Sequence, residues 1–298
     1  MKKALDIAVI SDVHLGTYGC HAAELLTYLK SIDPKMLILN GDFTDTRSLG
    51  KSNFPKSHIN VVRYILKMAN RGTQVYYITG NHDDALRRYS DFDSGNMHLR
   101  NKLVLQLKGE RYWFFHGDVF DNFTRLSPTV AKLGGKGYDL LIFVNRFINK
   151  MRRRLGKPRI SVSKKIKSEV KAAGKIINDF EQTAVSLAAR ENYDYVVCGH
   201  IHRPQIRMQR VGERLVTYMN SGDWVENLTA LEYGGNKWRI YEYDEADFVT
   251  VNKKLRVEPS DIPSESADAE AILSAMVGRS TFAWLKARNN RQNGTVER

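Results

Sequence analysis

The sequence predicts an α/β fold in which short β-strands alternate with helices. Apolar runs lie near residues 7–10, 36–39 and 74–78. Between them, the segments near 21–30 and 57–70 have apolar residues at helical spacing. This alternation is typical of a parallel sheet that is covered by helices. We therefore expect the chain to begin with a βαβαβ unit.

Further strands are expected after this unit. Apolar runs near residues 103–105 and 112–115 flank a turn at 108–110 and predict a hairpin that is added to the same sheet. Five more strands with glycine-containing turns are expected near 195–198, 205–208, 215–218, 228–231 and 238–241. The core domain is therefore expected to comprise residues 1–123 and 192–250.

The segment between the two parts of this core has a different character. Residues 124–191 have helical spacing of apolar residues and few strand formers, which predicts a helical insertion. The insertion is basic, because residues 131–175 contain 14 Lys or Arg against two acidic residues, in a chain with a formal net charge of +13. Such focused charge favours phosphorylated substrates, acidic lipid headgroups or nucleic acid as partners. Residues 251–298 are expected to form a polar linker and then a helix near 271–287.

Other features predict where the protein works. No apolar run approaches the ~20 residues of a transmembrane helix. The apolar run that follows Met1 breaks at Asp6 without a cleavage site, so we interpret it as the first strand and not as a signal peptide. Cys20 and Cys198 lack the spacing of a zinc site, which favours free thiols in a reducing compartment. We therefore expect a cytoplasmic protein.

Five of the expected strands run into residue types that bind metal ions. The motifs are Asp12-Val13-His14, Asn40-Gly41-Asp42, Gly80-Asn81-His82-Asp83, His116 and Gly199-His200-Ile201-His202. The carboxyl ends of strands in an α/β sheet lie along one edge, so these motifs can converge. Each motif alone is more often an ordinary turn, and the ordered set of five carries the prediction. His21, His58 and His98 do not belong to this pattern and are expected at the surface.

The chemistry of the motifs predicts two metal ions. A mixture of Asp, Asn and His side chains suits Mn, Fe, Co or Zn better than Mg or Ca. Seven candidate ligands are too many for one ion: Asp12, His14, Asp42, Asn81, His116, His200 and His202. Two divalent ions about 3.5–4 Å apart that share one carboxylate would use them all, and such a pair promotes hydrolysis at phosphorus.

In this order, the five motifs resemble those of the calcineurin-like metallophosphoesterases, over about residues 5–245. The resemblance implies a four-layer αββα sandwich with the site at its edge. It implies that one metal is held by Asp12, His14, Asp42 and His202, and the other by Asp42, Asn81, His116 and His200. Asp42 would then bridge the two ions. It also implies that His82 stabilises the transition state or protonates the leaving oxygen, and that Asp83 orients His82.

Three further features resemble the UDP-2,3-diacylglucosamine pyrophosphatase group: the His116-Gly117-Asp118 run, the basic insertion and residues 220–224. This resemblance implies manganese-dependent cleavage of UDP-2,3-diacylglucosamine to UMP and 2,3-diacylglucosamine 1-phosphate, a step of lipid A synthesis, by a protein peripherally bound to the inner membrane. The insertion would then be a lid over the acyl chains. Expected substrate contacts are Asn81, Arg152, Arg153, Lys164 and Lys167. One departure is His82, where the best-known branch of the group has Arg.

Two other interpretations stay open. A phosphodiesterase or nuclease could use the same metal ligands while the basic insertion holds a polynucleotide backbone. The aromatic residues of the insertion lie mostly within apolar runs, which favours lipid over nucleic acid. A membrane-associated metal-binding scaffold without turnover is the third hypothesis, and the retained His82 argues against it.

Overall fold

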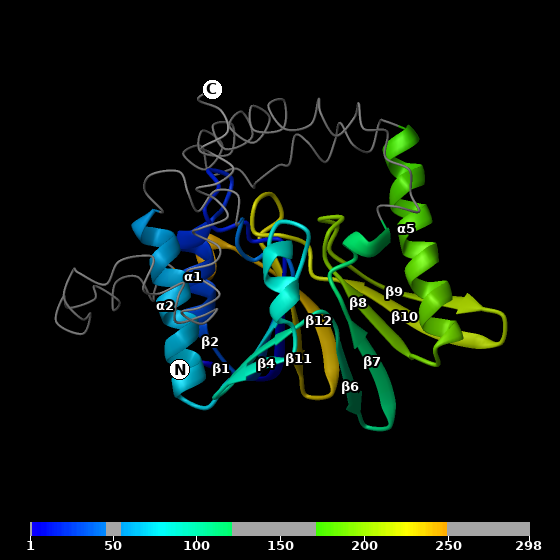
Figure 1. Cartoon of the computed structure of the whole chain (residues 1–298), viewed down its shortest axis with the longest axis horizontal. Helices are drawn as coiled ribbons and strands as arrows, with labels where there is room; N and C mark the ends of the chain where they lie inside the picture. Colours follow the sequence, from blue (N-terminus) through cyan, green and yellow to red (C-terminus); the bar gives the residue numbers. More distant parts are fainter. Residues whose placement is uncertain (1, 46–54, 121–170, 249–298) are drawn as a thin grey trace.

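The computed structural model describes residues 2–45, 55–120 and 171–248, which fold into two stacked β-sheets (Figure 1). In edge-to-edge order, the first sheet contains β12 (Lys237–Glu242), β11 (Thr229–Gly234), β1 (Lys3–Ile10), β2 (Ile32–Asn40), β3 (Gln74–Ile78), β5 (Met97–Arg100) and β4 (Phe92–Ser94). The second contains β6 (Leu103–Leu107), β7 (Glu110–Phe114), β8 (Tyr195–Cys198), β10 (Arg214–Asn220) and β9 (Gln205–Val211).

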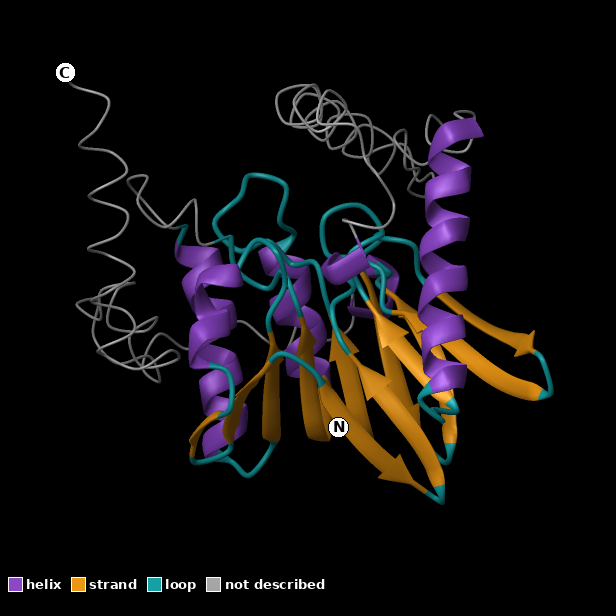
Figure 2. Cartoon of the chain, turned by 45° about the vertical axis from the view of Figure 1, so that its right-hand side comes forward, coloured by secondary structure: helices purple, strands orange, loops and turns teal. Residues whose placement is uncertain are grey.

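Helices form the two outer layers (Figure 2). The helices α1 (Ala22–Ser31) and α2 (Lys56–Asn70) pack on the outer face of the first sheet. The helix α5 (Lys171–Arg190) packs on the outer face of the second sheet. Short 3-10 helices η1 (Asp84–Tyr89), η2 (Asp118–Phe120) and η3 (Glu245–Phe248) follow β3, β7 and β12. The four-layer αββα sandwich is therefore confirmed.

The strand β1 illustrates why these residues form a sandwich. Ile7 and Val9 face the core between the sheets, whereas Ala8 and Ile10 face the core under α1 and α2. All four side chains are buried. Because both faces of the sheet are covered, β1 is an almost continuous apolar run and not an alternating one.

Parallel pairing brings strand ends to one edge. The strands β1, β2 and β3 are parallel neighbours in the first sheet. The strands β7, β8 and β10 are parallel neighbours in the second sheet. The residues after these carboxyl ends are therefore placed side by side.

The expectation that the hairpin near residues 103–115 is added to the sheet of β1, β2 and β3 is wrong. The hairpin of β6 and β7 belongs to the second sheet, where β7 pairs with β8, whereas β11 and β12 return to the first sheet. Leu103, Leu105 and Phe114 in this hairpin face the core between the sheets. The apolar residues of a strand indicate that it has a buried face, but they do not indicate which sheet it joins. Strands of both sheets bury a face in the core between the sheets.

Part of the expected insertion can be placed. Residues 171–190 form α5, and its side chains Ala184, Val185 and Ala188 are buried against the second sheet. The lid, the cations Arg152, Arg153, Lys164 and Lys167, and the C-terminal helix lie outside the described residues. Within the described ranges, no helix is long and apolar enough to cross a membrane.

Candidate metal centre

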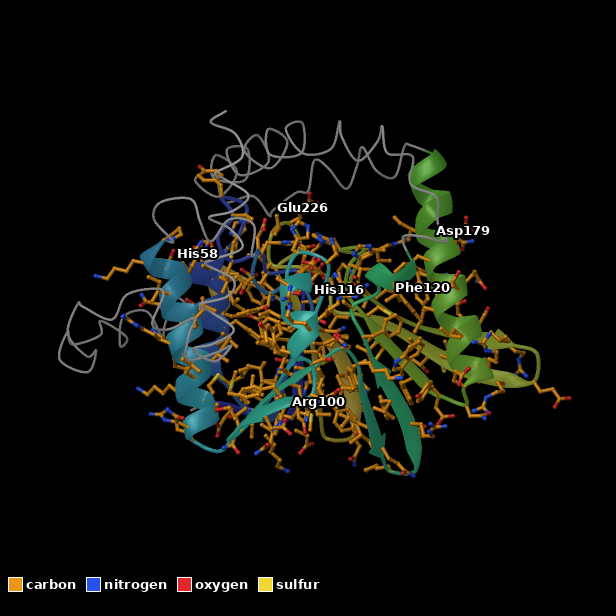
Figure 3. All side chains as sticks on the ribbon, in the orientation of Figure 1. His58, Arg100, His116, Phe120, Asp179 and Glu226 are labelled. Carbon is orange, nitrogen blue, oxygen red and sulfur yellow. The ribbon has the colours of Figure 1, made fainter. Side chains whose placement is uncertain are left out.

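The structure brings all seven predicted ligands to the carboxyl edge of the two sheets. Asp12 and His14 follow β1, Asp42 follows β2 and Asn81 follows β3. His116 follows β7, and His200 and His202 follow β8. His116 lies in the middle of the molecule, between α2 on one side and α5 on the other (Figure 3).

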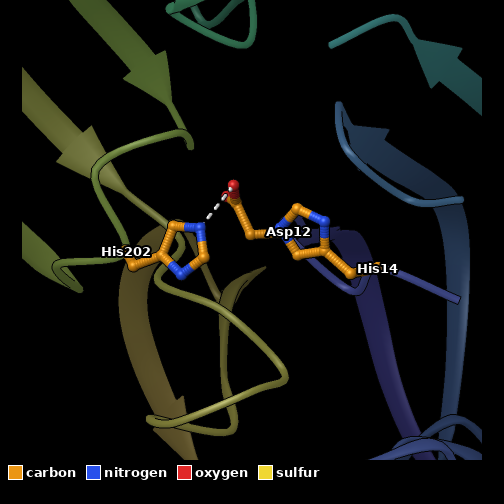
Figure 4. A group of neighbouring side chains, drawn as sticks. All are labelled: Asp12, His14 and His202. Carbon is orange, nitrogen blue, oxygen red and sulfur yellow. Dashed lines mark ion pairs between the residues drawn. The ribbon is translucent and has the colours of Figure 1, made fainter. Parts of the chain in front are cut away.

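Asp12, His14 and His202 form the first group. Their potential ligand atoms all lie within 4.8 Å of one another. The Nε2 atom of His202 lies 3.1 Å from Oδ1 of Asp12 (Figure 4). The backbone N–H of His200 donates to Oδ2 of Asp12 at 3.0 Å, which holds the carboxylate in this orientation.

The second group contains Asp42, His116 and His200, again within 4.8 Å. The Nε2 atom of His116 lies 3.3 Å from Oδ2 of Asp42. The Nε2 atom of His14 lies 3.9 Å from the same oxygen, so Asp42 also contacts the first group. The backbone N–H of His82 fixes Asp42 by donating to Oδ1 at 2.8 Å.

Two buried polar atoms in the site fit a metal ligand better than a hydrogen-bond partner. The Oδ1 atom of Asn81 has no hydrogen-bond partner among the described residues. The Nδ1–H of His116 donates to the Asn40 carbonyl at 3.0 Å, so Nε2 is the ring nitrogen that faces the site and could bind a metal ion in place of a proton. Histidine ligands of metals are commonly oriented by such a hydrogen bond through the other ring nitrogen.

The backbone of the ligand turns is unusual. Asp12, His14, Asp42, His200 and His202 have φ angles of 52, 52, 51, 65 and 52°, in the left-handed region. Each such residue costs about 1–3 kcal/mol, and such costs concentrate at functional sites. Five of the seven predicted ligands therefore hold a conformation that folding alone disfavours.

Glycines make room for the ligands. A Cβ atom on Gly80 would lie 2.2 Å from Oδ1 of Asp42, and one on Gly199 would lie 2.5 Å from Oδ2 of Asp12. A Cβ atom on Gly41 would lie 2.3 Å from the His116 ring. These separations are far shorter than van der Waals contact, so only glycine fits at these turns.

The electrostatics of the site keep the carboxylates of Asp12 and Asp42 ionised. Burial opposes the charge of Asp12, but His202 and His116 outweigh it and lower the pKa of Asp12 to about 2. Burial likewise opposes the charge of Asp42, and His116 and His14 lower its pKa below the ordinary value. Burial lowers the pKa of His14 to about 4, despite the opposing effect of Asp42. Anionic carboxylates beside imidazole form a donor set that suits a divalent cation.

The two predicted catalytic residues, His82 and Asp83, have different surroundings. The Nε2 atom of His82 lies 3.9 Å from Oδ2 of Asp42. We expected Asp83 to orient His82, but the Asp83 carboxylate accepts hydrogen bonds from Phe43 N at 3.1 Å, from the Tyr77 hydroxyl at 2.7 Å and from Gly80 N. Asp83 therefore holds the turn that carries the ligands.

Asp45 is the carboxylate beside His82. Its Oδ2 atom lies 3.5 Å from the Nδ1 atom of His82. Asp45 was not among the predicted site residues, although its place three residues after Asp42 puts it in the same loop. The Gly41-Asp42-x-x-Asp45 spacing was the available signal.

The interpretation of His58 as a surface residue is wrong. His58 is 5% exposed, and its Nδ1 atom accepts a hydrogen bond at 2.9 Å from the backbone N–H of Gly16. This bond ties α2 to the loop that carries His14. Nothing in the sequence around His58 indicates it, because the acceptor and donor are 42 residues apart.

The chain matches a known family and several known proteins. Residues 5–204, about two thirds of the chain, match the family described as Calcineurin-like phosphoesterase. A UDP-2,3-diacylglucosamine hydrolase of Blochmanniella pennsylvanica (strain BPEN) is 26% identical, covering 68% of this chain and 81% of that protein. Another, of Aliivibrio fischeri (strain MJ11), is 25% identical, covering 82% of this chain and 100% of that protein. A solved archaeal phosphodiesterase is 12% identical over 79% of this chain and 98% of that chain, with a TM-score of 0.37.

Fold, donor set and family agree. The αββα sandwich carries three overlapping groups of potential metal-binding side chains at one edge, because His14, Asp42 and His82 form a group that links the two described above. The family match, over residues 5–204, includes every strand that leads into a ligand motif and extends through His202. The chain is therefore a metal-dependent phosphoesterase that belongs to the calcineurin-like phosphoesterase family.

Proposed function

We propose that the chain hydrolyses a pyrophosphate bond with two divalent ions that share Asp42. Asp12, His14, Asp42 and His202 would hold one ion, and Asp42, Asn81, His116 and His200 the other. The observation that carries this proposal is the position of Asp42, whose carboxylate approaches both His14 and His116. When bound, such a pair of ions activates water and stabilises the attacking and leaving oxygens at phosphorus.

His82 is the residue that we assign to proton transfer. Its side chain is 31% exposed, so it can reach a substrate, and its ring lies beside the Asp42 carboxylate. We propose that His82 stabilises the transition state or donates a proton to the leaving oxygen. Asp45 would fix the orientation of the His82 ring, and Asp83 would fix the turn.

Manganese is the metal that we propose. The cage combines carboxylate and amide oxygens with imidazole nitrogens, and ions such as Mn, Fe, Co and Zn accept such a mixture. Asp12, Asp42 and Asn81 supply oxygen donors, which suit Mn better than the other ions of this set.

The substrate that we propose is UDP-2,3-diacylglucosamine, which would yield UMP and 2,3-diacylglucosamine 1-phosphate for lipid A synthesis. Support comes from the relatives named UDP-2,3-diacylglucosamine hydrolase, which align over most of the chain at 22–26% identity. The basic segment 131–175 supports it as well, because an anionic amphiphile needs cations beside apolar surface. Asn81, Arg152, Arg153, Lys164 and Lys167 are the contacts that we propose.

We further propose that the protein works in the cytoplasm, peripherally bound to the inner membrane. Clusters of Lys and Arg bind anionic lipid surfaces by about 1 kcal/mol per residue near the surface. Flotation with phosphatidylglycerol vesicles, compared with phosphatidylcholine vesicles, tests this. We expect binding to the anionic vesicles that falls as salt rises; equal binding to both would contradict it.

One assay tests the substrate. The manganese-supplemented protein is given UDP-2,3-diacylglucosamine, single-stranded DNA or a small chromogenic diester, and the products are identified by mass. We expect UMP from the first substrate and slow turnover of the diester. Cleavage of DNA in preference to the glycolipid would favour the nuclease hypothesis, for which the same basic segment would hold the polynucleotide.

A further inference from the structure

A buried carboxylate that is not a metal ligand lies beside the metal centre. Glu181 in α5 is 3% exposed. The residue before it, Phe180, packs near the ring of His200, with ring centroids 6.1 Å apart. The turn of α5 that carries Glu181 therefore lies next to the site. The proposed hydrolysis does not involve the Glu181 carboxylate.

Two half-exposed arginines surround Glu181. The Nη1 atom of Arg203 lies 4.0 Å from Oε1, and the Nη1 atom of Arg207 lies 3.8 Å from Oε2. Gln205 also donates to Oε2, at 3.2 Å. The two arginine side chains are 53% and 57% exposed, whereas that of Glu181 is 4% exposed. One buried negative charge therefore holds two positive charges at the surface.

Arg203 and Arg207 keep N–H donors that can bind an anion in addition to the Glu181 carboxylate. A carboxylate is strongly unfavourable in a protein interior unless cations accompany it, and the guanidinium groups of Arg203 and Arg207 both lie within 4.0 Å of Glu181. Separations of 3.8 and 4.0 Å exceed hydrogen-bond length, so these contacts leave N–H groups of both arginines available. With two arginines and one glutamate, the cluster keeps a net positive charge.

Arg203 extends from a backbone that the metal centre fixes. It directly follows the ligand His202, whose carbonyl oxygen accepts a hydrogen bond from Asn227 Nδ2 at 2.8 Å. It precedes Pro204, which restricts the Arg203 backbone to extended conformations. The start of the arginine side chain is therefore set by a ligand on one side and by proline on the other.

We propose that Arg203, supported by Glu181 and Arg207, binds the second phosphoryl group of a diphosphate substrate while the first lies at the metal centre. The inference rests on the proposed function, because it takes the metal ligands to bind the phosphate that is attacked. A guanidinium matches the oxygens of a phosphate in a two-pronged geometry. A substrate with one phosphate offers Arg203 no group, so Arg203 selects diphosphates over single phosphate esters.

The test uses the full-length, manganese-loaded protein and a small chromogenic diester. Competitive inhibition constants of UDP and UMP are measured at a fixed concentration of free manganese, for the parent and for R203Q. We expect R203Q to raise the inhibition constant of UDP relative to that of UMP by about tenfold, which is the lower end of the effect of losing a charge-assisted hydrogen bond. R203K keeps the charge but not the planar guanidinium, so its ratio of UDP to UMP inhibition constants should lie between those of the parent and R203Q.

Arg239 provides a matched control. It is also a half-exposed arginine beside a buried glutamate: its Nε atom lies 3.5 Å from Glu232 Oε2, and its side chain is 54% exposed. This pair lies within β11 and β12, at the β12 side of the first sheet, and not at the carboxyl edge that carries the ligands. R239Q should leave both the UDP to UMP ratio and the hydrolysis of the diester unchanged.

The outcomes separate this inference from the function on which it rests. A parent protein that hydrolyses no phosphoester overturns the proposed function. An active parent in which R203Q and R203K both keep the parental UDP to UMP ratio, with parental manganese content and melting temperature, overturns the role of Arg203. A tenfold change that R239Q reproduces also overturns it, because the effect would then not depend on proximity to the site.

Discussion

The two sheets contribute different chemistry to the metal centre. The first sheet supplies Asp12, His14, Asp42 and Asn81, and so every oxygen ligand of the predicted set. The second sheet supplies His116, His200 and His202, and so only imidazoles. The nearest contacts run between the sheets, since Asp12 approaches His202 at 3.1 Å and Asp42 approaches His116 at 3.3 Å.

Neither sheet alone therefore holds a complete site. Parallel pairing aligns the ends of β1, β2 and β3, but it leaves the carboxylates of Asp12 and Asp42 without His202 and His116, the imidazoles that approach them most closely. Docking of the second sheet, through the core that contains Val9, Phe114 and Met219, supplies those partners. Metal binding, sheet docking and turnover should therefore respond together when a contact across the sheets is broken.

Loss of the shared carboxylate should have the largest effect. Asp42→Ala removes the oxygens that lie near both His14 and His116, so neither metal position keeps its full donor set. We expect kcat/KM on a chromogenic diester with manganese to fall about 10³-fold or more, because metal ions supply several kcal/mol of transition-state stabilisation. Manganese content, measured by mass spectrometry, should fall with it.

Asp6→Ala is the control for that variant. Asp6 lies on β1 of the same sheet and pairs with Lys35 at 2.8 Å on the surface. Exposed pairs contribute about 0–1 kcal/mol, so activity should stay within about twofold. Parental turnover by Asp42→Ala would contradict the shared role of Asp42.

Gly199→Ala tests the contact between the sheets without removing any ligand. The added Cβ would lie 2.5 Å from Asp12 Oδ2 and 2.7 Å from Ser11 Oγ, which must push the end of β1 away from β8. Misplacement of a ligand by about 1 Å can cost about 10²-fold in rate, and we expect a loss of that size in kcat/KM. Gly234→Ala is the control, since its Cβ would make an ordinary contact at 3.4 Å with Leu5. Equal activities of the two variants would contradict this role of Gly199.

Local patterns in the sequence predict the α/β class and the candidate ligands, whereas the four-layer sandwich was predicted from the resemblance of the five motifs to those of a known family. Strands that run into Asp, Asn or His are visible without a structure, and parallel strands must end at one edge. The sheet membership of β6 and β7 could not be predicted in this way. It depends on the pairing of β7 with β8, whose residues are more than 80 positions away.

The roles of His58 and Glu181 could not be predicted either, because their partners are distant in the sequence. His58 contacts Gly16 across 42 positions, and Glu181 approaches Arg203 from a different layer of the sandwich. Asp83 stands next to His82 in sequence, yet its carboxylate bonds to the turn, whereas Asp45 faces the His82 ring. Residues that are adjacent in a turn can have different partners, because their side chains point in different directions.

Metal removal should loosen the connection between the sheets. An ion bound at 100 times its dissociation constant stabilises the folded state by about 2.7 kcal/mol. At about 2–4 °C per kcal/mol for a protein of this size class, chelation with EDTA should lower the melting temperature by about 5–10 °C. Asp42→Ala should show little or no EDTA effect. An unchanged melting temperature in the parent would contradict the link between metal binding and sheet docking.

The smallest effect is expected from Asp45, whose carboxylate lies beside the ring of His82 in the loop after β2 of the first sheet. Asp45→Asn removes the charge 3.5 Å from His82 Nδ1, and a residue that orients a functional histidine typically contributes about 10–100-fold. We expect kcat to fall about tenfold while manganese content, KM and the EDTA effect on melting stay parental. Asp83→Asn should instead lower the melting temperature, because the Asp83 carboxylate accepts three hydrogen bonds in the turn. If Asp45→Asn instead lost manganese, Asp45 would belong to the cage and not to His82.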